Sequence, residues 1–81
     1  MTLLEIRIEL KKGVADPEGE NTKKALELLG FNVNKVRSIK VFEIEVDEKN
    51  EEKAIEIGKE MCRKLLANPV IHKYSVEVKR E

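Results

Sequence analysis

The sequence has 81 residues, of which 41% are apolar and 40% are charged, and its 16 basic residues balance its 16 acidic ones. A chain this short has room for one domain, residues 1–81, and for a small core that oligomerisation often supplements, so we expect a homodimer or homotetramer. The absence of net charge argues against a nucleic acid or an anionic membrane as the partner.

The first predicted element is a strand that begins at Leu4. Apolar side chains occupy the even positions from Leu4 to Leu10, and charged side chains occupy the odd positions from Glu5 to Lys11. Because side chains alternate between the two faces of a strand, this pattern predicts one buried face and one solvated face.

A helix is predicted from about Asp16 to Leu29. Asp16 suits the N-cap position, and Pro17 suits the first position of the helix. Apolar residues then recur at helical spacing, and Gly30 tolerates the left-handed backbone conformation in which many helices end.

Residues 31–46 are strand-like, but the phase of their apolar residues changes. Ile39 and Val41 lie at odd positions, whereas Phe42, Ile44 and Val46 lie at even ones. One regular strand cannot satisfy both phases. A bulge or a tight hairpin around residues 38–40 would resolve the conflict, and we predict two strands.

A second helix is predicted from about Glu51 to Ala67. Asn50 suits its N-cap, and two glutamates in the first turn suit the helix dipole. Asn68-Pro69 ends the helix, because the residue before a proline disfavours helical conformation. Alternating apolar residues over 74–78 predict a final strand.

The predicted element order is therefore β-α-β-β-α-β, which defines an α+β fold. Two helices packed on one face of an antiparallel sheet would form a two-layer sandwich, a variant of the ferredoxin-like fold. The other face of the sheet would remain free, and we expect the sheets of two copies to pair in a dimer.

Cysteine content and hydropathy bear on the cellular compartment. The single cysteine cannot form an internal disulfide, and no apolar run approaches the roughly 18 residues of a membrane span. The first residues enter the alternating pattern directly, without the features of a secretory signal. We expect a cytoplasmic protein, and the abundance of glutamate and lysine is typical of thermophilic proteins.

The sequence predicts no catalytic, cofactor-binding or metal-binding residues. The only histidine, His72, has no recognisable nucleophile near it in sequence and is expected at the surface. Cys62 lies in the apolar stripe of the second helix and is expected in the core. The acidic residues over 47–52 lack the spacing of a calcium loop. Gly13 and Gly19 flank a helix start that could hold an anion, but the expected N-cap is already negative.

Two stretches of the chain resemble a known family. They are residues 10–19, with the sequence LKKGVADPEG, and residues 61–71, with the sequence MCRKLLANPVI. Together with residues 25–31, Val36-Arg37 and Tyr74, they are similar in order and separation to the PurS family over nearly the whole chain.

The resemblance implies an accessory subunit of phosphoribosylformylglycinamidine (FGAM) synthase, a glutamine-dependent C–N ligase of de novo purine biosynthesis. In that complex a large synthetase subunit (PurL-type) uses ATP and Mg, and a glutaminase subunit (PurQ-type) releases ammonia from glutamine. The small subunit is implied to bind no cofactor of its own, to bridge its two partners and to help enclose the path of ammonia.

We expect the partner contacts at eight residues: Val14, Asp16, Pro17, Gly19, Arg37, Lys40, Asn68 and Pro69. Capping, turn formation and surface charge explain these residues equally well. The residues alone also leave open a stand-alone module that senses a small molecule. An RNA-binding sheet is disfavoured because aromatic residues are few.

Overall fold

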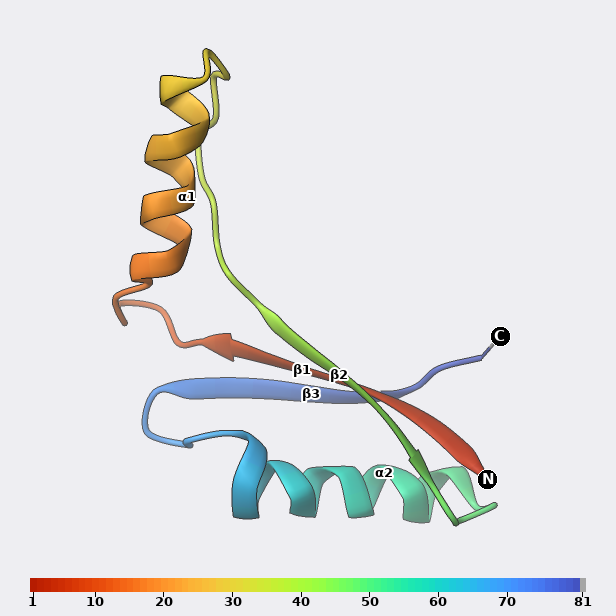
Figure 1. The fold of residues 1–81 in the computed structure, drawn as a ribbon. Coiled ribbons are helices and arrows are strands. Elements are labelled where there is room, and N and C mark those ends of the chain that lie inside the picture. The colour runs from red at the N-terminus through yellow and green to blue at the C-terminus, as the bar shows by residue number, and fades with distance from the viewer. Residues whose placement is uncertain (81) are drawn as a thin grey trace.

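The computed structural model describes residues 1–80, and it contains three strands and two helices. In chain order the elements are β1 (Thr2–Leu10), α1 (Pro17–Leu28), β2 (Lys40–Val46), α2 (Glu51–Met61), the short π-helical segment η1 (Cys62–Leu66) and β3 (His72–Val78). The strands form one antiparallel sheet in the order β2-β1-β3, with the first strand of the chain in the middle (Figure 1). The α+β class and the antiparallel sheet with two helices are thus confirmed.

The core lies between the sheet and α2. Leu4 and Ile6 of β1 are fully buried, and Ala54 and Cys62 contribute from the helical layer. Gly58 allows a close approach, because a Cβ atom at this position would stand 2.7 Å from Val76 Cγ1. The even positions of β1 therefore face the helix, as the period-two pattern predicted.

The opposite face of the sheet is charged. Glu5 of β1 lies between Glu43 of β2 and Glu77 of β3 in the antiparallel register. Like charges in adjacent strands repel one another, so this row disfavours face-to-face packing of two such sheets. The ion pair from Lys79 to Glu43 offsets part of the repulsion.

Both helices begin at the predicted caps. The side chain of Asp16 accepts a hydrogen bond from the N–H of Gly19, and the side chain of Asn50 accepts one from the N–H of Lys53. Gly30 has a φ of 97°, in the left-handed region, and it lies directly after the end of α1 as predicted. These signals are local, which is why the sequence located them to within a residue or two.

Residues 31–39 correct the expectation of two strands before the second helix. Only β2 (Lys40–Val46) is a strand, and its apolar residues at 42, 44 and 46 face α2 together with the even positions of β1. Residues 31–39 run alongside α1 as an extended segment (Figure 1). They form no ladder because no strand of the described chain lies beside them.

The placement of α1 also differs from the expected two-helix layer. The helix and residues 31–39 together project from the sheet as an arm, while α2 alone packs on the sheet (Figure 1). The chain is correspondingly elongated, with principal extents of 48 × 31 × 15 Å. The physical reason lies in the contacts at the base of this arm, which hold α1 against residues 36–38 and away from the strands.

Candidate functional site

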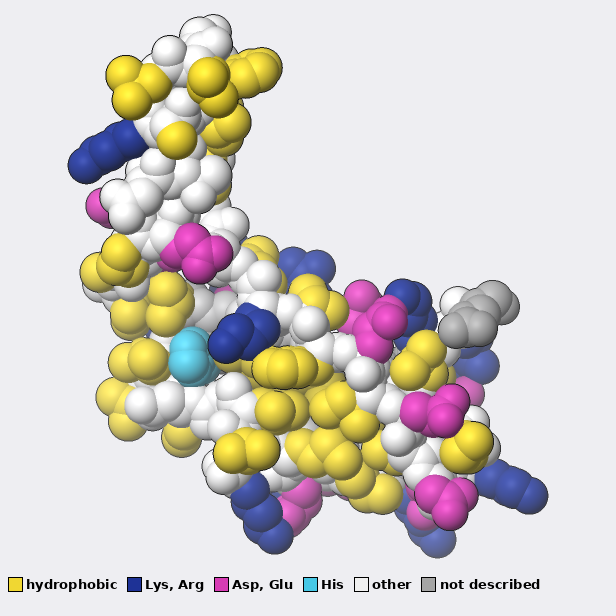
Figure 2. All heavy atoms as spheres, viewed as in Figure 1, with side chains coloured by type: hydrophobic (Ala, Val, Ile, Leu, Met, Phe, Trp, Pro, Cys, Tyr) yellow, Lys and Arg dark blue, Asp and Glu magenta, His cyan; other side chains and the backbone are white. Residues whose placement is uncertain are grey.

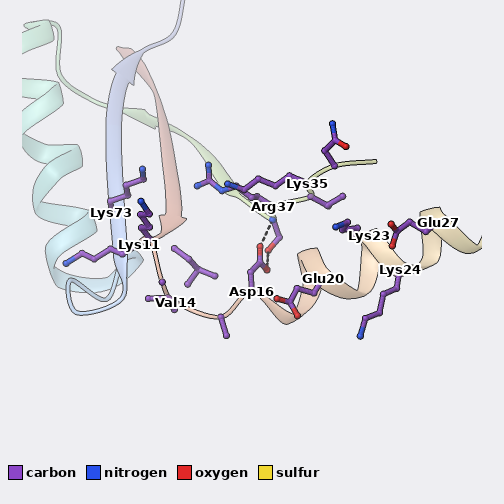
Figure 3. A pocket seen from close by; sticks show the side chains of 17 residues that line it. Lys11, Val14, Asp16, Glu20, Lys23, Lys24, Glu27, Lys35, Arg37 and Lys73 are labelled. Carbon is purple, nitrogen blue, oxygen red and sulfur yellow. Dashed lines mark hydrogen bonds between the residues drawn. The ribbon is translucent and has the colours of Figure 1, made fainter. Parts of the chain in front are cut away.

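A groove of about 700 Å³ runs along the base of the arm. Its walls come from α1, from the loop that follows β1 and from residues 34–38 (Figure 3). The charged side chains that line it are Lys11, Lys12, Asp16, Glu20, Lys23, Lys24, Glu27, Lys35, Arg37 and Lys73. Seven of these ten are basic, although the chain as a whole is neutral.

Part of this basic charge has no ionic partner within residues 1–80. Arg37 forms an ion pair with Glu9 at 3.2 Å, and Lys73 approaches the same glutamate at 3.9 Å. No ion pair of the described chain engages the lysines at positions 12, 23, 24 and 35. The groove therefore offers an attractive field to acidic groups of a partner.

Asp16 is the centre of the contacts that hold the arm. Its Oδ1 accepts hydrogen bonds from the Gly19 N–H at 3.0 Å and from the Ser38 hydroxyl at 2.6 Å. Its Oδ2 accepts the N–H of Ser38 at 2.8 Å, so one carboxylate joins the start of α1 to the far end of the extended segment. Figure 3 shows Asp16 and its hydrogen bonds to Ser38 among the residues that line the groove.

These hydrogen bonds hold the pKa of Asp16 below its ordinary value of 3.8. The largest cause is the hydrogen bond from the Ser38 hydroxyl, followed by those from the backbone N–H groups of Ser38 and Gly19. Because the pKa is lower in the folded state, the contribution of Asp16 to stability is present above pH 3.8 and is lost as the pH falls below it.

The variant Asp16→Asn should be less stable than the wild type at pH 7. An asparagine keeps one acceptor but turns an NH₂ donor toward the donors of Ser38. The gap between the two melting temperatures should narrow as the pH falls below 3.8, the ordinary value for aspartate, because the wild-type carboxylate is then lost as well. Thermal melts at both pH values test this.

Asp47→Asn is the matched control, since Asp47 is exposed and accepts no hydrogen bond within residues 1–80. The melting temperature of this control should be close to that of the wild type at both pH values. If the difference in melting temperature between the wild type and Asp16→Asn stays constant with pH, the Asp16 carboxylate does not stabilise the base of the arm.

The structure brings some of the sequence-predicted contact residues together. Val14, Asp16 and Arg37 line the groove, and Gly19 is buried directly behind it. Pro17 is exposed at the first position of α1. Whether these five residues contact a partner stays a prediction.

The remaining three predicted residues lie outside the groove. Asn68 and Pro69 follow η1, and the Nζ of Lys11 donates to the carbonyl oxygen of Pro69 at 2.6 Å, so their turn adjoins the loop after β1. Lys40 lies at the start of β2 and borders a second hollow of about 320 Å³ on the helix side of the sheet. Whether these three residues contact a partner also stays a prediction.

Sequence reasoning missed Ser38 and the unpaired lysines of the groove. Ser38 binds a residue 22 positions away, and no pattern in the sequence announces that contact. No pattern in the sequence marked Lys23 and Lys24 as part of a site. Only the direction of the arm brings them near Lys35 and the loop after β1 (Figure 3).

His72 and Cys62 have structural roles here. The Nδ1 of His72 accepts the N–H of Asn68 at 2.9 Å, and the His72 N–H donates to the carbonyl oxygen of Asn68 at 2.7 Å. The histidine therefore closes the turn before β3 and is half-buried, not plainly exposed as expected. Cys62 is fully buried as predicted, and burial raises the pKa of its thiol. A thiol in this environment is a poor nucleophile.

Two other kinds of feature, a metal cluster and a membrane-spanning helix, are absent from the part of the chain that the structure describes. Residues 1–80 contain no cluster of three or more histidine, cysteine, aspartate or glutamate side chains arranged to hold a metal ion. Among the same residues, no helix combines the length and the apolar character needed to span a membrane.

Comparison with known proteins adds a family match. Residues 3–80 match the family model described as PurS, phosphoribosylformylglycinamidine (FGAM) synthase. A curated relative from Archaeoglobus fulgidus, phosphoribosylformylglycinamidine synthase subunit PurS, is 57% identical over 75 residues, covering 91% of this chain and 94% of the relative.

Solved structures agree with that match. PurS of Methanocaldococcus jannaschii superposes with a TM-score of 0.89 at 49% identity, covering all of this chain and 99% of the other. A chain in the structure of PurLQS from Thermotoga maritima gives a TM-score of 0.82 at 39% identity, covering 98% and 100% of the two chains.

Proposed function

Because this chain belongs to the PurS family, we propose that it is the small, non-catalytic subunit of an FGAM synthase complex in de novo purine biosynthesis. In this role it bridges a PurL-type synthetase subunit and a PurQ-type glutaminase subunit. The observation that carries the proposal is its likeness, over nearly its full length, to a chain in the structure of the Thermotoga maritima PurLQS.

The chemistry of the groove supports a positioning role. Its lining combines several lysine side chains with Asp16, whose two oxygens are already engaged by Ser38 and Gly19. Such a surface attracts acidic side chains and orients a docked protein. Under this proposal ATP, Mg and glutamine are bound by the partner subunits, which carry out the bond making.

A bridge between the two enzymes would favour the transfer of ammonia from one active site to the other. Ammonia released into water is diluted and protonated, whereas two active sites held in register pass it on at high local concentration. We therefore propose that the small subunit works as a homo-oligomer, a dimer or tetramer, that aligns the two enzymes and helps to enclose the ammonia path in the cytoplasm.

Reconstitution with the purified PurL-type and PurQ-type subunits of the same organism tests the bridge. Glutamine-dependent FGAM formation should require this chain, whereas ammonia-dependent FGAM formation by the synthetase subunit should not. If glutamine supports the same rate without the chain, the bridging role is wrong. The ammonia reaction serves as the internal control for an active synthetase.

The same assay tests the groove as a docking surface. The double variant K23E/K24E reverses two charges of the lining and should weaken glutamine-dependent activity, an effect that grows at low subunit concentration. Lys53→Glu is the matched control, because Lys53 is exposed on α2 and outside the groove. If the two variants support the same glutamine-dependent activity, the groove does not contact a partner subunit.

A further inference from the structure

The segment that follows α2 exposes two large apolar side chains. Leu65 of η1 is 84% exposed, and Val70, in the turn before β3, is 78% exposed. Pro69 is exposed in the same turn, and these three residues are named the η1 patch. Figure 2 shows hydrophobic side chains gathered at the end of the sheet from which the arm projects. Exposed apolar side chains that are grouped in this way mark a surface for binding another molecule.

The π-helical form of η1 is what exposes Leu65. Leu65 follows the buried Gly58 by seven positions, a spacing that would place it on the buried face of an uninterrupted α-helix. The N–H of Ala67 instead donates to the carbonyl oxygen of Cys62, five positions earlier, at 3.0 Å. The wider turn packs Leu66 against the core and leaves Leu65 in solvent. Such π-helical turns are rare and occur frequently at functional sites.

Hydrogen bonds fix the turn that carries Val70. Asn68 Oδ1 accepts the N–H of Val70 at 3.0 Å, and the carbonyl oxygen of Asn68 accepts the N–H of His72 at 2.7 Å. The Nζ of Lys11 donates to the carbonyl oxygen of Pro69 at 2.6 Å. The backbone of the turn is therefore ordered before any partner binds, which reduces the entropy that association would cost.

The charge around the η1 patch is basic. Residues 61–73 contain two lysines, one arginine and no acidic residue. Glu60 is the ionic partner of both Arg63, at 3.7 Å, and Lys64, at 3.1 Å, so one negative charge faces two positive ones. Lys11 adds a further positive charge beside the turn. The surface therefore combines apolar anchors with a positive rim, as protein interfaces often do.

We propose that the η1 patch docks onto one of the two partner subunits, in an apolar pocket that carboxylates surround. A second copy of this chain is the poorer occupant, because a symmetric contact through the same patch would bring two positive rims together. The inference rests on the bridging role in the proposed function, and it adds a contact surface outside the groove.

Binding of the purified chain to each partner subunit separately, measured by titration calorimetry, tests the proposal. Leu65→Glu and Val70→Glu should each weaken binding to the same subunit by at least about tenfold, because a charge would enter a desolvated apolar contact. Both side chains are exposed in the single chain, so the far-ultraviolet circular dichroism and the sedimentation of the variants should match those of the wild type.

Ser75→Glu is the matched control for the added charge. Ser75 is exposed, and it lies beside Arg7 on the charged face of the sheet, opposite the face that α2 covers. This variant should bind both subunits as the wild type does. If Leu65→Glu and Val70→Glu bind as tightly as Ser75→Glu, the η1 patch is not a docking surface. A change in self-association without a change in binding to either subunit would assign the patch to a second copy and would also overturn the proposal.

Lys64→Gln tests the carboxylates proposed on the partner. The association rate of the wild type with the subunit identified above should fall as the salt concentration rises. The fall should be smaller for Lys64→Gln, because one attractive charge is missing, and unchanged for Lys49→Gln, which removes an exposed charge before the start of α2. The same salt dependence in all three proteins would contradict an acidic pocket rim.

The reconstitution assay separates this inference from the bridging role. If glutamine-dependent activity requires the chain, and Leu65→Glu supports it as well as Ser75→Glu does at low subunit concentration, the η1 patch is wrong and the bridge stands. If the chain binds one subunit through the patch but glutamine-dependent activity does not require the chain, the patch stands and the bridge is wrong. A wild-type chain that binds neither subunit would overturn both.

Discussion

Replacing Ile6 by alanine should lower the free energy of unfolding by about 2 to 5 kcal/mol. Ile6 is fully buried at the centre of β1, opposite Phe42 in β2 and Val76 in β3. The substitution removes apolar contact area and leaves a cavity that a three-stranded sheet cannot close. The whole stability of a small domain is about 5 kcal/mol at the low end, so the variant should be largely unfolded at elevated temperature.

Urea denaturation followed by circular dichroism measures this loss. The protein concentration must be the same for all variants, since any self-association would add to the apparent stability of the folded chain. Val41→Ala is the control, because Val41 lies on the charged face of β2 and is exposed. The free energy of unfolding of Val41→Ala should be lower than that of the wild type by less than about 1 kcal/mol. Equal losses for the two variants would mean that the helix side of the sheet is not the core.

Gly19→Ala should destabilise the chain, by about 1 to 3 kcal/mol. In an ordinary helix the same change stabilises by roughly 0.5 to 1 kcal/mol, because alanine is the better helix former. Here the new Cβ would stand 2.5 Å from Asp16 Oδ2 and 2.8 Å from the carbonyl oxygen of Val36. The helix must therefore move away from residues 36–38, which weakens the hydrogen bonds between Asp16 and Ser38.

Hydrogen exchange of the α1 amides, together with urea denaturation, tests the sign of this effect. Exchange should accelerate in Gly19→Ala, because the helix loses the contacts at the base of the arm. Asn21→Ala is the matched control on the same helix, since Asn21 is exposed and outside the groove, and it should be neutral or slightly stabilising. Stabilisation in both variants would contradict the close approach at Gly19.

Much of the fold could be predicted because its signals are local. The alternation from Leu4 to Leu10 identified the central strand and its buried face, and the caps at Asp16 and Asn50 located both helix starts. The buried state of Cys62, which lies in η1, followed from the apolar stripe of the second predicted helix. Each prediction needs only the geometry of a few neighbouring residues, which the backbone imposes wherever that pattern occurs.

The sequence by itself determined the two helices, the first and last strands, which of their faces are apolar, and the resemblance to a family. Only the tertiary structure decided that α1 stands off the sheet, that residues 31–39 remain outside the sheet, and that lysines from four segments meet in one groove. The reason is the range of the interactions. Capping and alternation act over a few residues, whereas the contact of Asp16 with Ser38 spans 22 positions and sets the direction of the whole arm.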